Sequence, residues 1–205
     1  MEFFNMIWNA ISTPNETLIN IISIPLAFFI EIPLTFYLIT SIFKINYCKK
    51  QKYIYIIAVS FVTLLSMFIL ENPYNILFNY IANFIIIYFV FHIGKFKNMI
   101  ATIFPSIIFS LLMALFLNPY LTLLNITYEQ VNEIPVYRFP LLLFVYLFVF
   151  IFVIILKSKN LTINVLNTFD KKNKTIITFN FIFGCLTIII QSLLTINYID
   201  ILPIG

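Results

Sequence analysis

Long apolar stretches recur along most of this 205-residue chain, and they limit its possible folds more than any other feature. An uninterrupted apolar stretch of about 18 residues or more is typical of a helix that crosses a lipid bilayer. Hydrophobic residues make up 62% of the sequence and charged residues 10%. In a typical soluble domain about 45–50% of the residues are hydrophobic and about 25% are charged. The sequence therefore predicts an all-α, polytopic helical membrane protein and excludes an ordinary water-soluble domain.

The apolar stretches predict six transmembrane helices within a single domain of residues 1–205. We expect these spans at about 18–43, 53–70, 74–92, 98–118, 139–156 and 175–197. The segment before the first span, "MEFFNMIWNAIS", places apolar residues on one helical face and is too short to cross. It predicts a short interfacial helix, a position that suits Trp8.

The sequence "TPNE" at 13–16 predicts where the first span begins. Thr13 can be the N-cap, Pro14 suits the first helical position, and Glu16 completes a capping box.

The charged residues divide between the two predicted sides of the membrane. Eleven of the 12 basic residues follow the first, third and fifth spans: Lys44, Lys49, Lys50, Lys52, Lys95, Lys97, Lys157, Lys159, Lys171, Lys172 and Lys174. Arg138 falls on the other side with most of the acids. By the positive-inside bias, we expect a multi-pass protein of the cell membrane with both termini outside the cytoplasm. The lysines then face anionic headgroups of the lipid bilayer, and no nucleic acid is expected.

Residues that could support catalysis or metal binding are scarce. His92 is the only histidine, and Cys48 is the one cysteine predicted on its side of the membrane, but no motif surrounds either residue. Ligands for a metal are lacking, and the three glycines form no phosphate-binding loop. We therefore predict no catalytic residue, no metal and no cofactor.

Glu31 lies in the middle of the first span, within "FFIEIPLTF" at 28–36. An acid at bilayer depth should face the interior of the bundle and find a partner. Thr35 lies one turn further on, and Asn83 and Gln191 are the expected partners on other helices.

Two interpretations of Glu31 remain open, and proton-coupled transport is a third. Glu31 either holds helices together in a span bent by Pro25 and Pro33, or it belongs to a water-accessible site that responds to a ligand.

Arg138 is the one basic residue on the predicted outer side, at the start of the fifth span. It either reaches lipid phosphate or binds an anionic group of an extracellular ligand, such as a peptide carboxylate. The outer connection before it, 119–138, is long and offers a surface suited to a hydrophobic peptide: Tyr120, Leu121, Leu124, Tyr128, Val131, Ile134 and Tyr137.

Three stretches, "NMIWNAISTPNETLINIISIPLAFFIEIPLTF", "NPYLTLLNIT" and "FDKKNK", resemble the membrane sensor region of clostridial peptide-sensing histidine kinases of the accessory gene regulator type. The resemblance covers about a third of the chain. It implies six or seven spans that sense an extracellular autoinducer peptide, followed by a cytoplasmic histidine kinase domain that acts on a response regulator. The phosphoacceptor helix and the ATP-binding boxes of that family are missing here, so we expect a sensor module whose kinase domain would follow a further span after Gly205. We expect the module to be a homodimer.

A second function also fits six spans of this length. The chain could be the substrate-binding membrane subunit of a small-molecule transporter, although few glycines argue mildly against it, because close helix packing favours small residues. A membrane peptidase is disfavoured by the missing His–Cys motif. A neighbouring response regulator or kinase gene would support sensing, and a neighbouring ATPase gene would support transport.

Overall fold

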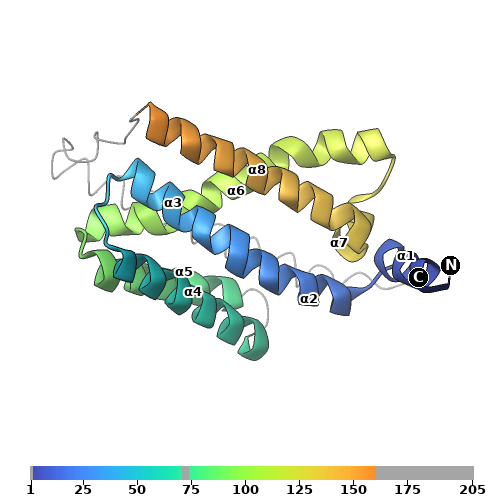
Figure 1. Ribbon diagram of the computed structural model, residues 1–205, viewed down its shortest axis with the longest axis horizontal. Coiled ribbons are helices and arrows are strands. Elements are labelled where there is room, and N and C mark those ends of the chain that lie inside the picture. The colour runs from blue at the N-terminus through green and yellow to red at the C-terminus, as the bar shows by residue number, and fades with distance from the viewer. Residues whose placement is uncertain (1, 71–73, 160–205) are drawn as a thin grey trace, which may run out of the picture.

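The computed structural model describes residues 2–70 and 74–159, and every regular element within these ranges is a helix (Figure 1). The elements are α1 (Glu2–Ser12), α2 (Glu16–Leu26), η1 (Ala27–Glu31), α3 (Ile32–Ile42), α4 (Lys49–Ile69), α5 (Tyr74–Phe91), α6 (Lys95–Leu124), α7 (Tyr128–Glu133) and α8 (Pro135–Ser158). The all-α prediction is confirmed for this part of the chain.

Four helices of the described ranges are long and apolar enough to cross a bilayer: Glu16–Ile42, Lys49–Ile69, Lys97–Leu124 and Pro135–Ser158. The third predicted span is helical as α5, but its apolar part counts as a shorter helix, Phe78–Phe91. The predicted sixth span, 175–197, lies outside the described residues. The structure therefore supports a multi-pass membrane protein, while the predicted number of six spans is not confirmed.

The first span is one continuous helix made of α2, η1 and α3, and its middle turn is a π-helix. The N–H of Ile32 bonds to the carbonyl of Ala27, five residues back, so the turn is wider than an α-helical turn. Pro25 and Pro33, which cannot donate backbone hydrogen bonds, lie on either side of this turn. The wide turn thus lies between the two prolines and ends at Glu31.

The predicted start of this helix is wrong by two residues. Asn15 is the N-cap, and its side chain accepts a hydrogen bond from the Leu18 backbone N–H at 3.0 Å. The Thr13 hydroxyl instead donates to the Asn9 carbonyl at 2.7 Å. Thr13 therefore closes the last turn of α1, and the cap of the next helix is Asn15.

The connection 119–138, expected as a loop, is mostly helical. α6 runs on through Pro119 to Leu124 and ends at Asn125, whose left-handed backbone (φ 53°) forms the C-cap. Thr127 and Gln130 then form a capping box that starts α7. The "T-Y-E-Q" pattern at 127–130 is a capping-box sequence that predicts this helix start, and it was not used in predicting 119–138.

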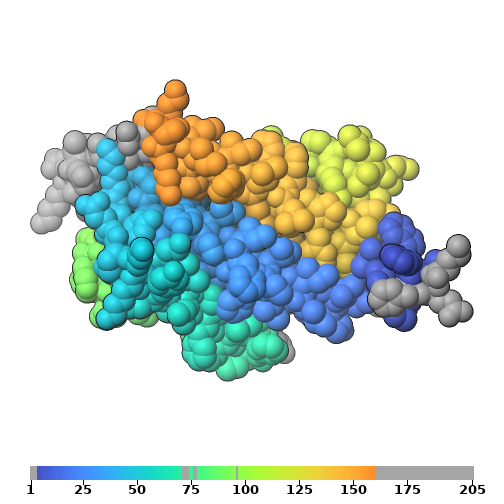
Figure 2. Space-filling view, viewed as in Figure 1, coloured from blue at the N-terminus to red at the C-terminus, as the bar shows by residue number. Residues whose placement is uncertain are grey.

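α3 is the central helix of the bundle. It packs against α4, α6 and α8, and Figure 2 shows the first span lying between α8 and α4 on one face of the molecule. Phe36 of α3 is fully buried, and its ring lies 5.6 Å from that of Tyr55 and 5.9 Å from that of Phe91, measured between centroids. Large apolar side chains such as Phe29 (81% exposed) point outward, as lipid-facing residues do.

The described lysines gather at one end of the bundle. There α3 and α8 end while α4 and α6 begin (Figure 1). Gln51 donates to the Val90 carbonyl at 2.8 Å, which joins the start of α4 to the end of α5. Arg138 lies toward the opposite end, where it lines a cavity with Glu16 and Glu133. The separation of charge inferred from the sequence therefore exists in space, and which end faces the cytoplasm stays a prediction.

Candidate functional site: a polar cavity inside the bundle

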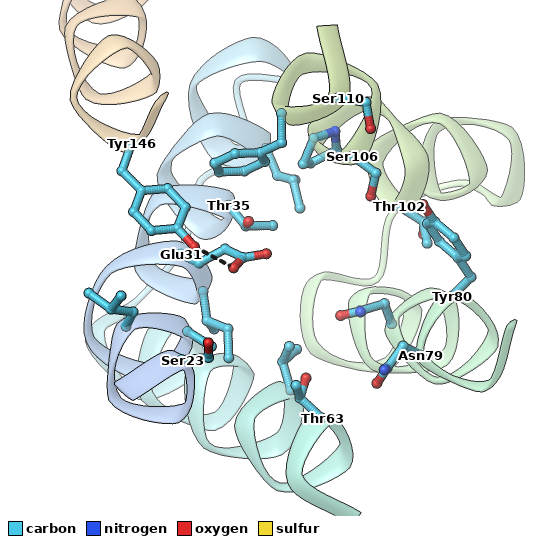
Figure 3. A pocket seen from close by; sticks show the side chains of 18 of the residues that line it. Ser23, Glu31, Thr35, Thr63, Asn79, Tyr80, Thr102, Ser106, Ser110 and Tyr146 are labelled. Carbon is cyan, nitrogen blue, oxygen red and sulfur yellow. Dashed lines mark hydrogen bonds between the residues drawn. The ribbon is translucent and has the colours of Figure 1, made fainter. Parts of the chain in front are cut away.

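A cavity of about 500 Å³ lies among α2, η1, α3, α4, α5, α6 and α8 (Figure 3). Its polar lining comes from all of these helices: Ser23, Glu31, Thr35, Thr63, Asn79, Tyr80, Asn83, Thr102, Ser106, Ser110, Arg138 and Tyr146. Ligand pockets are typically about 300–1,000 Å³. Polar groups at bilayer depth are costly, so their concentration here marks this cavity as the candidate site.

Glu31 lies on the wall of this cavity, and its partner is a tyrosine. Tyr146 of α8 donates its hydroxyl proton to Glu31 Oε2 at 2.9 Å (Figure 3). Thr35, Asn83 and Gln191 are the partners predicted from the sequence, and Tyr146 is not among them. Thr35 and Asn83 line the same cavity, and Gln191 lies outside the described residues. Tyr146 stands in a long apolar run, where nothing in the sequence distinguishes it from a lipid-facing residue.

α5 contributes a row of asparagines spaced four residues apart, Asn75, Asn79 and Asn83. Residues four apart share one face of a helix, and the last two of the row line the cavity. Only Asn83 of this row was predicted as a site residue, although the four-residue spacing of the three asparagines is visible in the sequence.

The side-chain oxygens of Asn79 and Asn83 are buried and accept no hydrogen bond within the described residues. The Ser23 hydroxyl, on the α2 side of the same cavity, is also buried and unpartnered there. An unsatisfied buried polar group costs about 1–3 kcal/mol. Such atoms in a cavity of this size are positioned to bind a ligand or water.

Arg138 lines this cavity and also a second one of about 540 Å³ that includes Asn15, Glu16 and Glu133. Its Nη1 donates to the carbonyl of Asn132 at 3.0 Å, and its side chain is half-buried. The guanidinium therefore stands where the two cavities share a wall. This position differs from that of an arginine that extends freely to lipid.

The expected peptide-binding surface of 119–138 is partly used for internal packing. Val131 and Ile134 are buried, and the Tyr120 hydroxyl donates to the Tyr137 carbonyl at 2.9 Å. Tyr128 remains exposed. The segment is folded against α8, with Val131 of α7 buried, so it does not offer one continuous apolar surface.

Within the described residues, no group of three or more His, Cys, Asp or Glu side chains could hold a metal ion. Comparison of the chain with protein-family models, with curated proteins and with solved structures finds no match in any of the three.

Proposed function

We propose that this chain is the membrane sensor module of a bacterial two-component system, and that its polar cavity binds an extracellular, quorum-sensing-type peptide. The single observation that carries the proposal is the cavity itself. It lies between apolar helices and holds Glu31 and two asparagine oxygens that the described residues leave unsatisfied. Buried acceptors in the wall of a cavity can be satisfied by a ligand that enters it, which supports a binding role.

Arg138 supports a route into the cavity from outside the cell. It borders both the central cavity and the second cavity at the acidic end of the bundle. With the lysine-rich end in the cytoplasm, the acidic end is extracellular. A peptide carboxylate would then meet Arg138 before the rest of the ligand reaches Glu31.

The first span is the element best suited to pass a signal across the membrane. Its π-helical turn ends at Glu31, inside the cavity, and the same helix continues to Ile42 at the lysine-rich end. π-helical turns are rare within helices and frequently lie at functional sites. We propose that ligand binding shifts α3, and that a cytoplasmic kinase domain reads this shift in a homodimer and passes it to a response regulator.

The topology that we propose has six spans, including 175–197, with both termini outside. The alternative function, a substrate-binding subunit of a small-molecule transporter, is favoured by one specific observation. A cavity of about 500 Å³ lined by helices of the bundle suits a compact solute as well as a short peptide.

The experiment is to identify what the cavity retains. The full chain is incubated in lipid nanodiscs with the fraction of spent growth medium below about 1 kDa, washed, and analysed by mass spectrometry. We expect a short peptide on the parent and on a Phe89→Leu control, which changes an exposed side chain of α5, and none on Asn83→Leu. Retention of a non-peptide solute would favour the transporter. The absence of any solute that depends on Asn83 would contradict both functions.

A further inference from the structure

We infer that the deep part of the central cavity binds a primary ammonium group, and that the ligand is held there through its free amino end. This inference rests on the proposed function and adds the chemistry of the ligand. Its basis is that Glu31, Asn79 and Asn83 all present hydrogen-bond acceptors to one cavity. Figure 3 shows Glu31 and Asn79 on opposite walls, with the space of the cavity between them.

The amide of Asn79 is oriented by a chain of hydrogen bonds. Ser66 donates its hydroxyl proton to the Thr63 carbonyl at 2.8 Å. Its oxygen must therefore act as the acceptor toward Asn79, whose Nδ2 donates to it at 2.8 Å. With the nitrogen committed to Ser66, the oxygen is the end of the amide left without a donor. This oxygen is therefore available to accept a hydrogen bond from a ligand or from water.

Glu31 adds a carboxyl group to these amide oxygens. Tyr146 donates to Oε2, which leaves Oε1 and further lone pairs as acceptors. A carboxylate at bilayer depth is stabilised most by an opposite charge that also donates hydrogen bonds. A primary ammonium has three donors, so one such group can pair with the Glu31 carboxyl and still donate to an amide oxygen.

Arg138 also lines this cavity and is positively charged, but it does not form an ion pair with Glu31. It precedes Tyr146 by eight residues on α8, which corresponds to about 12 Å along the helix axis, and its Nη1 donates to Asn132. An extended peptide covers about 3.3–3.6 Å per residue. A peptide of three or four residues could therefore place its amino group at Glu31 and its carboxylate at Arg138.

The test uses four named probes on the full chain in lipid nanodiscs. They are the tripeptide Ile-Phe-Ile with free ends, its N-acetylated form, its C-terminal amide, and 2-phenylethylamine. The measurement is the ligand-dependent rise in melting temperature, from which a dissociation constant is fitted. We expect the free tripeptide to bind at least about tenfold more tightly than its N-acetylated form, which corresponds to one lost charge-assisted hydrogen bond.

The probes also distinguish two sources of the ammonium group. Binding of the tripeptide with little effect of 2-phenylethylamine identifies a peptide amino terminus, and the reverse identifies a free amine. Glu31→Gln and Asn83→Ser should each abolish the preference for the free amino group, while Phe89→Leu should keep it. Asn83→Ser leaves the Glu31–Tyr146 hydrogen bond intact, so it remains informative if Glu31→Gln disturbs folding.

Equal binding of the free and N-acetylated tripeptides would overturn the inference and leave the proposed function standing. Failure of all four probes on the folded parent would also overturn it. In that case the mass-spectrometric retention of a solute decides the proposed function separately.

A second, independent observation concerns the lysine-rich end. The ammonium groups of two lysines lie near the ring of Tyr37 in α3. Lys157 Nζ lies 4.2 Å and Lys52 Nζ 4.8 Å from the ring centroid, and Lys52 also donates a hydrogen bond to the Tyr37 hydroxyl. We propose that this cluster, Tyr37, Lys52 and Lys157, binds the phosphate of an anionic phospholipid headgroup.

Two features of the described residues call for an anion here. Four of the described acids, Glu2, Glu16, Glu129 and Glu133, belong to elements at the opposite end of the bundle, and Glu31 lies in the middle of the first span, where Tyr146 is its hydrogen-bond partner. In addition, α4 begins with lysines and no acid in its first turn, although the N-terminus of a helix favours negative charge. A phosphate between the two ammonium groups would satisfy both the lysines and the helix end.

Native mass spectrometry tests this site. The full chain is taken from bilayers that contain equal amounts of phosphatidylglycerol and phosphatidylcholine. We expect the parent and Lys159→Gln to retain phosphatidylglycerol, and the Lys52→Gln/Lys157→Gln double variant to retain less than half as much. Equal retention by the double variant would refute the lipid site. Displacement of the lipid by millimolar inorganic phosphate would show that a free anion, not a lipid, is the ligand.

Discussion

The hydrogen bond between Tyr146 and Glu31 makes the sharpest prediction about the stability of this bundle. Tyr146→Phe removes the donor and leaves the ring in place, where it packs edge-on against Phe109 at 5.8 Å between centroids. No cavity is created, so the change in the free energy of unfolding reports the hydrogen bond alone. Glu31→Gln keeps an oxygen that can accept from Tyr146 and should cost less than about 0.5 kcal/mol.

The magnitude follows from the depth and length of this bond. Hydrogen bonds between transmembrane helices average about 0.6 kcal/mol and reach about 1.7 kcal/mol, because the unfolded chain in a membrane also finds partners. The 2.9 Å distance is long for an O–H to carboxyl bond, but Tyr146 is only 7% exposed. We therefore expect Tyr146→Phe to lower the free energy of unfolding by about 1 kcal/mol. Glu31→Leu, which also removes the acceptor facing the cavity, should cost about 1–3 kcal/mol.

The assay is equilibrium unfolding in mixed detergent micelles, with Glu31→Leu, Tyr146→Phe and the double variant forming a cycle. We expect a coupling energy of about 1 kcal/mol, so the double variant should lose about 1 kcal/mol less free energy of unfolding than the sum of the two single losses. Tyr53→Phe, at an exposed tyrosine of α4, is the matched control and should cost nothing measurable. A coupling below about 0.3 kcal/mol, the level expected of independent sites, would refute the pairing.

Three further predictions concern other parts of the bundle. Asn98→Asp should lower the free energy of unfolding by about 1–3 kcal/mol in the same assay, because it replaces the buried amide that donates to the α5 backbone with an acceptor. Asn98→Ala should lower the free energy of unfolding by less. Equal stability of Asn98→Asp and the parent would contradict this role. Gln51→Ala should lower the free energy of unfolding by about 1 kcal/mol, since Gln51 accepts from the Cys48 backbone at the start of α4 and donates to the α5 backbone. An unchanged unfolding midpoint would argue against a stabilising role of these two hydrogen bonds. In intact cells that express a cysteine-free background, Glu129→Cys should react with an impermeant thiol reagent and Lys50→Cys should not, and labelling of Lys50→Cys would reverse the proposed orientation.

The amino-acid sequence by itself determined the class of this protein. Its composition and its apolar stretches require a helical membrane protein, because each stretch must satisfy its own backbone hydrogen bonds in lipid. Within the described residues the same local information located the starts of the five predicted transmembrane helices to within four residues, although it ended α6 six residues too early, placed the first N-cap at Thr13 instead of Asn15 and treated 119–138 as a loop. It also indicated that Glu31 should matter, since one acid stands out in an apolar span.

The tertiary structure decided which residues meet. Tyr146 is 115 residues from Glu31 in the chain, and the apolar residues all around α8 give no sign of which face points inward. In water an amphipathic pattern would reveal that face, whereas in lipid both faces of a spanning helix are apolar. The convergence of Glu31, Asn79 and Asn83 on one cavity therefore depends on how the helices are rotated and packed, which only contacts between distant segments fix.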